Sequence, residues 1–116
     1  VVSCQLPDFQ SEHKQVEVIA ASGDINYEEI LTRSSLMVTD YSGVQFDFAY
    51  QRKPLVYYHP HQLPPQYEEG GLEYASMGFG PICTDHETVV DAICHYMENA
   101  CEMEPEYIQR ADTFFA

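Results

Sequence analysis

The fold of this chain is decided by one stretch of sequence, Val38-Thr39-Asp40-Tyr41-Ser42-Gly43-Val44-Gln45-Phe46-Asp47-Phe48-Ala49. Its apolar start ends at short polar residues and a glycine, after which apolar residues recur at helical spacing. This pattern predicts a buried strand that runs through a tight turn into a helix. The first N–H groups of a helix lack internal partners and carry a partial positive charge, so the turn suits a phosphate group. The alternative is an ordinary capped junction, and the stretch alone leaves the two interpretations equally open.

Short strands and helices are expected to alternate on both sides of this stretch. Strands are predicted at 16–19, 36–39 and 55–58, and helices at about 26–33 and 43–51. Either Asp24 or Asn26 is expected to cap the first of these helices. Strand, helix, strand, helix, strand with short connections is typical of a parallel sheet with right-handed crossovers. The predicted fold class is therefore α/β, a Rossmann-like parallel sheet flanked by helices.

After the strand at 55–58 the regular pattern breaks. Prolines and glycines interrupt residues 59–80, which predicts a long loop with one short turn of helix. This loop leaves the carboxyl end of a strand, where open α/β sheets bind their ligands. A short fourth strand is expected at 81–83.

Two further helices are predicted near the C-terminus. Thr84 and Glu87 are expected to form a capping box at the start of the first one. Its buried face is expected to comprise Val89, Val90, Ile93, Cys94 and Met97. Pro105 suits the first turn of the second helix. The face of that helix is expected to present Tyr107, Ile108, Ala111, Phe114 and Phe115.

The composition is that of an acidic globular domain. Nineteen Asp and Glu against five Lys and Arg give a formal net charge of −14 over 116 residues. Such a charge repels nucleic-acid phosphates and anionic lipids, so neither a nucleic acid nor a membrane is expected to bind this segment. A helix N-terminus acts within about one turn, so a locally bound phosphate remains compatible with this charge.

The chain is expected to divide into an irregular N-terminal segment, 1–15, and a single α/β domain, 16–116. It opens without a methionine and ends directly after Phe114-Phe115, so we interpret it as a domain excised from a longer protein. The four cysteines form no C-x-x-C pair, which favours free, mostly buried thiols over disulfides. They are Cys4, Cys83, Cys94 and Cys101.

Several separated motifs carry a resemblance to a known family. They are T-D-Y-S-G at 39–43, F-D-F-A at 46–49, K-P-L-V-Y-Y at 53–58, Y-E-E at 67–69, G-F-G-P at 78–81, Y-M-E-N at 96–99, Tyr107, Arg110 and F-F at 114–115. In this order they resemble the C-terminal half of the CDP-glycerol:poly(glycerophosphate) glycerophosphotransferase family, bacterial enzymes that build teichoic-acid-type polymers. The likeness covers roughly residues 16–116.

The resemblance implies a fold and a function for the chain. The fold would be the nucleotide-binding C-terminal half of a two-domain GT-B glycosyltransferase. The function would be to bind the donor, CDP-glycerol or CDP-ribitol, for transfer of polyol phosphate to an acceptor hydroxyl. The polymer acceptor would be reached through an N-terminal domain that this chain lacks, and no cofactor is implied. The setting would be the cytoplasm, with the inner face of the cell membrane reached through the rest of the enzyme.

The resemblance also implies the substrate-binding residues Thr39, Ser42, Gly43 and Asp47. Ser42 and Gly43 would hold the donor diphosphate, although the family usually reads T-D-Y-S-S where this chain has Gly43. Asp47 would accept hydrogen bonds from ribose or glycerol hydroxyls, against the alternative of a solvated acid that compensates the helix dipole. Asp40 is interpreted as structural because a carboxylate aimed at a diphosphate would repel it. No residue of this chain is assigned as catalytic.

Other polar residues are not assigned to a binding site. The His59-Pro60-His61 run is interpreted as loop histidines, since the intervening proline and the lack of a nearby cysteine argue against a metal pair; a substrate contact stays open for His59. Arg52 and Lys53 are expected to complement the dipole at the C-terminus of their helix. Two alternatives remain for the whole chain: a nucleotide-sugar glycosyltransferase or epimerase domain, and a non-catalytic interaction module.

Overall fold

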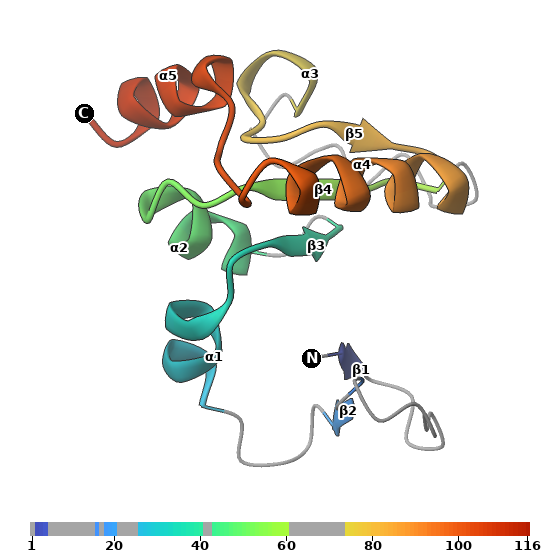
Figure 1. Cartoon of the computed structure of the whole chain (residues 1–116). Helices are drawn as coiled ribbons and strands as arrows, with labels where there is room; N and C mark the ends of the chain where they lie inside the picture. The colour runs from blue at the N-terminus through green and yellow to red at the C-terminus, as the bar shows by residue number, and fades with distance from the viewer. Residues whose placement is uncertain (1, 5–15, 17, 21–25, 41–42, 61–73) are drawn as a thin grey trace. The chain divides into compact units, whose positions relative to one another are not determined.

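The computed structural model describes residues 2–4, 16, 18–20, 26–40, 43–60 and 74–116 (Figure 1). By their contacts the residues fall into two compact units, Val1–Thr32 and Arg33–Ala116. The boundary between these units lies within the segment 16–116, for which the sequence predicted one domain. Each unit is described by itself.

The first unit contains a two-stranded parallel sheet and most of one helix. Strand β1 (Val2–Cys4) pairs in parallel with β2 (Val18–Ala20). The strand β1 lies within segment 1–15, for which the sequence predicted no regular structure. Helix α1 (Tyr27–Arg33) follows, and the Oδ1 atom of Asn26 accepts a hydrogen bond from the Glu29 N–H at 3.1 Å. Asn26 is therefore a cap of α1, while Asp24 lies outside the described residues.

The second unit is built on a parallel sheet of three strands, in the order β3-β4-β5. These strands are β3 (Met37–Thr39), β4 (Leu55–Tyr58) and β5 (Ile82–Cys83). Residue Met37 pairs with Leu55, and Tyr57 pairs with Ile82. The central strand β4 is a run of apolar and aromatic residues, as is typical of a strand that is covered on both faces. The predicted parallel α/β sheet is confirmed in this unit.

Helices cover both faces of β4. Helix α2 (Val44–Tyr50) lies on one face and α4 (His86–Glu98) on the other. Two further helices of the described residues are α3 (Tyr74–Met77) and α5 (Pro105–Phe114). Because side chains alternate along a strand, Val56 points to one face, where it packs under α4 with Val89 and Tyr96. Tyr57 points to the opposite face, where its hydroxyl bonds to Gln45 of α2. Figure 1 shows α4 lying along β4.

The start of α4 differs from the prediction by one residue. The capping residue is Asp85, whose Oδ1 atom accepts a hydrogen bond from the Thr88 N–H at 2.9 Å. The predicted capping box of Thr84 and Glu87 is therefore wrong. Both residue pairs have the spacing of a cap, but Asp85 is the residue with the extended backbone that a cap requires, with φ −136° and ψ 165°.

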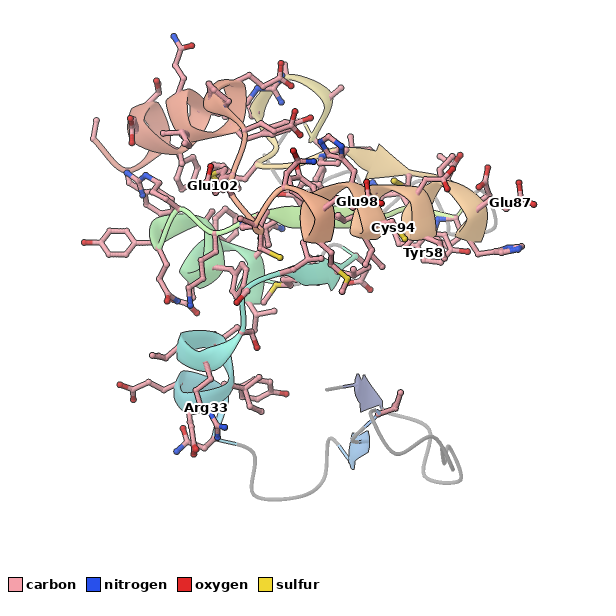
Figure 2. The ribbon with its side chains drawn as sticks, viewed as in Figure 1. Arg33, Tyr58, Glu87, Cys94, Glu98 and Glu102 are labelled. Atoms are coloured by element: carbon pink, nitrogen blue, oxygen red, sulfur yellow. The ribbon has the colours of Figure 1, made fainter. Side chains whose placement is uncertain are left out.

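The buried face of α4 also differs from the prediction. Val90 and Met97 are 54% and 66% exposed, and Cys94, labelled on α4 in Figure 2, is exposed as well. Of the predicted face, Val89 is buried and Ile93 is half-buried, and the other buried residue of the helix is Tyr96, which was not predicted. The cysteines Cys83, Cys94 and Cys101 are free thiols, as predicted, although Cys83 alone of these three is buried.

Candidate functional site

The strand ends of the second unit meet at one edge of its sheet. Thr39, half-buried, ends β3, and the exposed Asp40 follows it. At the end of β4 the Nε2 atom of His59 lies 3.3 Å from the Asp40 carbonyl oxygen. This contact ties the ends of two neighbouring parallel strands together. Ligands of open α/β sheets bind outside this edge.

Helix α2 starts at the same edge with an open first turn. Gly43 precedes Val44, is exposed, and has the right-handed backbone values φ −65° and ψ −17° with no side-chain cap. A Cβ atom added at Gly43 would meet no atom within 4 Å. A ligand can therefore approach this backbone closely, and the local space does not require the glycine. Ser42, the other predicted phosphate contact, lies outside the described residues.

Asp47 lies in the first turn of α2, one turn after Gly43. It is exposed, and its backbone carbonyl accepts a hydrogen bond from Gln51 Nε2 at 3.3 Å. The structure thus brings three predicted residues, Thr39, Gly43 and Asp47, to the edge of the sheet or to the helix that starts there. An acid in the first turn also compensates the helix dipole.

Behind this edge lies a buried chain of hydrogen bonds that the sequence analysis did not predict. The Tyr57 hydroxyl donates to Gln45 Oε1 at 2.6 Å, and Gln45 Nε2 donates to the Tyr74 hydroxyl at 3.1 Å. The Phe79 N–H donates to the Tyr57 hydroxyl at 3.1 Å. Gln45 is 1% exposed and Tyr57 is 0% exposed. A glutamine at an inward position of an apolar helix is the signal that could have revealed this chain.

The segment 78–80 passes close to β4 and α3 because it contains two glycines. A Cβ atom at Gly80 would overlap the carbonyl oxygen of Leu55. A Cβ atom at Gly78 would lie 2.5 Å from the carbonyl oxygen of Tyr74. The G-F-G-P motif therefore has a packing role: it lets this segment lie against the central strand.

Arg110 of α5 is a further residue to which the sequence alone assigned no role in the site. Its Nη1 atom donates to the Gly78 carbonyl at 3.0 Å, and its guanidinium carbon lies 5.3 Å from the centre of the Tyr107 ring. Burial and the neighbouring Glu106 raise the pKa of Tyr107 to about 12, so this phenol stays neutral. Within the described part of the chain Arg110 forms no ion pair, although acidic residues outnumber basic ones nearly four to one.

Arg110 lines a cavity of about 240 Å³ between α3 and α5. The other lining residues are Ser76, Met77, Gln109, Thr113 and Phe114. The Phe114 ring stacks on the ring of Phe46 with their centres 5.4 Å apart, and Phe46 directly precedes Asp47 in α2. The Phe114 ring is therefore the contact between the lining of this cavity and α2. Arg110 is the charged residue of this lining, which exposes more apolar than polar surface.

Arg52 is occupied at the other end of α2. Its Nη1 atom donates to the Tyr50 carbonyl at 2.7 Å and to the Ala49 carbonyl at 3.3 Å. Its Nη2 atom lies 2.9 Å from Asp112 Oδ1. These contacts confirm the prediction that Arg52 complements the C-terminus of the helix. They also leave Arg110 as the better candidate for a ligand anion.

Two kinds of feature are absent from the described residues. No group of three or more His, Cys, Asp or Glu residues is placed to hold a metal ion there. None of the helices in that part of the chain is both long and apolar enough to cross a membrane.

Comparisons with known proteins agree with the geometry. The family model described as CDP-Glycerol:Poly(glycerophosphate) glycerophosphotransferase matches residues 5–116. The minor teichoic acid biosynthesis protein GgaB of Bacillus subtilis (strain 168) is 38% identical over 112 residues. This alignment covers 97% of the chain and 12% of GgaB, so the chain spans about an eighth of that relative. No solved structure matches the chain.

Proposed function

The chain belongs to the CDP-glycerol:poly(glycerophosphate) glycerophosphotransferase family, and from this premise we propose that it binds the donor in such a transferase. The donor would be CDP-glycerol or CDP-ribitol, and the polymer made would be of the teichoic-acid type. The observation that carries the proposal is the open start of α2 at the carboxyl edge of a parallel sheet, with Gly43 and Asp47 one turn apart.

Each residue of the edge has a role in this proposal. The backbone at Ser42 and Gly43 holds the donor diphosphate, with the Ser42 hydroxyl and Thr39 as further contacts. Asp47 accepts hydrogen bonds from two neighbouring hydroxyls of ribose or glycerol. Arg110 supplies the positive charge that the diphosphate requires, because it lines a cavity whose Phe114 ring stacks on Phe46 of α2 and has no carboxylate partner within the described residues.

The proposed reaction is an in-line displacement at phosphorus. The oxygen of the acceptor hydroxyl forms a bond to the β-phosphorus of the donor. The bond from that phosphorus to the bridging oxygen breaks, and CMP leaves with the bridging oxygen. The hydroxyl proton passes to a base on another part of the enzyme. Catalysis of this kind depends on positioning and on stabilising negative charge, which are the tasks that Gly43 and Arg110 can perform.

The polymer acceptor would bind through the remainder of the enzyme. The acidic surface of this segment, with its net charge of −14, disfavours a direct contact with nucleic acid or anionic lipid. We place the reaction in the cytoplasm, where CDP-linked donors are available, with attachment to the inner face of the membrane through other parts of the protein.

The test is release of CMP by the full-length protein with a polyol-phosphate acceptor. We expect CMP from CDP-glycerol or CDP-ribitol and no turnover of UDP-N-acetylglucosamine. The variant Asp47→Asn should raise the KM for the donor. Turnover of the uridine sugar alone would overturn the proposal in favour of a glycosyltransferase or epimerase. Absence of turnover and of binding with every nucleotide would overturn it in favour of an interaction module.

A further inference from the structure

We propose that Gln45 and Tyr57 form a positioning pair that holds Arg110 in a fixed relation to the start of α2. This inference rests on the proposed function, because it concerns how the two halves of that site are kept in register. Gln45 lies two residues after Gly43, whereas Arg110 belongs to the last helix of the chain. A diphosphate that spans both needs their separation to be fixed.

The connection between them is a single peptide group. The Gly78 carbonyl and the Phe79 N–H belong to the same planar peptide unit, whose two ends point in opposite directions. The carbonyl accepts from Arg110 Nη1 at 3.0 Å, and the N–H donates to the Tyr57 hydroxyl at 3.1 Å. The Tyr57 hydroxyl then donates to Gln45 Oε1 at 2.6 Å. One continuous chain of hydrogen bonds therefore runs from Arg110 to α2.

All the donors in this chain point the same way. Arg110 donates to the peptide, the peptide to Tyr57, and Tyr57 to Gln45, so the bonds polarise one another and begin at a cation. Burial raises the pKa of Tyr57 well above its usual range, which keeps the hydroxyl proton in place as a donor to Gln45. The direction of the chain is thus fixed across the working pH range.

Gln45 and Tyr57 are polar, although apolar side chains could fill the same buried space. Gln45 and Tyr57 are at most 1% exposed, and a buried polar group is unfavourable unless its bonds are made. Hydrogen bonds are directional, so they specify one arrangement of neighbouring elements where apolar contacts would tolerate several. Gly78 and Gly80 serve the same end because only residues without a Cβ allow the bridging segment to lie this close to β4 and α3.

The test is a double-mutant cycle in the full-length enzyme. The substitution Tyr57→Phe should lower kcat/KM for the donor roughly tenfold, because Arg110 is then held less accurately. In the background of Arg110→Ala the same substitution should have little further effect, since its target is gone. Independent, multiplying effects of the two substitutions would overturn the proposal.

A matched control is offered by Tyr96 of α4, which is also buried and donates its hydroxyl to Glu104 Oε1 at 2.8 Å, outside the chain of hydrogen bonds that runs from Arg110 to Gln45. The substitution Tyr96→Phe should lower the melting temperature without a specific effect on kcat/KM. If Tyr96→Phe and Tyr57→Phe reduced activity equally at equal loss of stability, the role of Tyr57 would be structural only. Should Tyr57→Phe fail to fold, Tyr74→Phe takes its place in the cycle, because it removes the half-buried hydroxyl that accepts from Gln45 Nε2 and so loosens Gln45.

A second measurement distinguishes failure of this inference from failure of the proposed function. In the 116-residue chain without ligand, Tyr57→Phe should shift the NMR signals of the Arg110 guanidinium and of the Phe79 amide, and Tyr96→Phe should leave both in place. Unchanged Arg110 signals would overturn the positioning role whatever the enzyme transfers. Lack of CMP release by the wild type, with shifted Arg110 signals, would instead contradict the proposed reaction and leave the positioning pair supported.

Discussion

Gly80 shows how a single residue fixes the position of a whole segment. A Cβ atom there would overlap the carbonyl oxygen of Leu55 in the central strand. We predict that Gly80→Ala lowers the free energy of unfolding by about 3 kcal/mol, as expected for an overpacked core. Urea unfolding measures this change. A stability equal to the wild type would show that the segment can move away from β4 without loss.

At Gly43, in contrast to Gly80, the surrounding space leaves room for a side chain. The φ of Gly43, −65°, also suits any residue, so the glycine adds only flexibility to the unfolded chain. We predict that Gly43→Ser raises the free energy of unfolding by about 0.5 kcal/mol. It should also retain CMP release by the full-length protein, because the added hydroxyl faces the proposed diphosphate. A destabilised or inactive variant would show that the turn needs glycine after all.

At the scale of elements, the cap of α4 makes a pH-dependent contribution to stability. The hydrogen bonds from Thr88 lower the pKa of Asp85 below its ordinary value of 3.8. A lowered pKa in the folded state means that the stabilisation is complete above pH 4 to 5 and is lost as the pH falls through the folded pKa. We predict that Asp85→Ala lowers the melting temperature at pH 6 and that this effect becomes smaller as the pH falls below 3.8.

The control for this prediction is Asp85→Asn. An asparagine side chain also accepts the N–H bond of a cap but does not titrate. It should keep most of the melting temperature at pH 6 and should show no matching loss between pH 5 and pH 3. A difference between Asp85→Ala and the wild type that stayed constant from pH 6 to pH 3 would contradict the account of this cap.

The sequence predicts best those helices and strands that are marked by a single clear pattern. The four apolar residues Leu55–Tyr58 are the observed strand β4, and Pro105 begins α5 as expected. The face of α4 was predicted only in part, with Val89 and Ile93 correct, because apolar residues occur in adjacent pairs, such as Val89 and Val90, which fit two different faces. The burial of Tyr96, whose hydroxyl bonds to Glu104, selects one of them.

Some residues of the candidate site could be predicted from the sequence and others could not. Gly43 and Asp47 could be located from the sequence, because the strand, the turn and the helix that place them are consecutive. Arg110 could not be assigned, since its partner Gly78 is 32 residues away and its exposure to a cavity depends on the packing of α3 against α5. Contacts between distant residues leave no periodic signal in one sequence.

For the whole molecule, net charge is the dominant property. A charge of −14 on 116 residues opposes the compact state through self-repulsion. Added salt shortens the Debye length from about 30 Å at 0.01 M to about 8 Å at 0.15 M. We predict that the melting temperature rises when NaCl is raised over this range. A fall would indicate that attractive ion pairs, such as Arg52 with Asp112, outweigh the repulsion.

The proposed function depends on binding of a cytidine diphosphate polyol to this chain, and an NMR titration measures this binding. Amide signals of residues 43–47 and the guanidinium signals of Arg110 are followed as CDP-glycerol, CMP and UDP-N-acetylglucosamine are added in turn. We expect saturable shifts of both groups with CDP-glycerol, weaker shifts with CMP, and none with the uridine sugar. Shifts with the uridine sugar, or unchanged signals of both residues 43–47 and Arg110 at saturating CDP-glycerol, would overturn the proposed function.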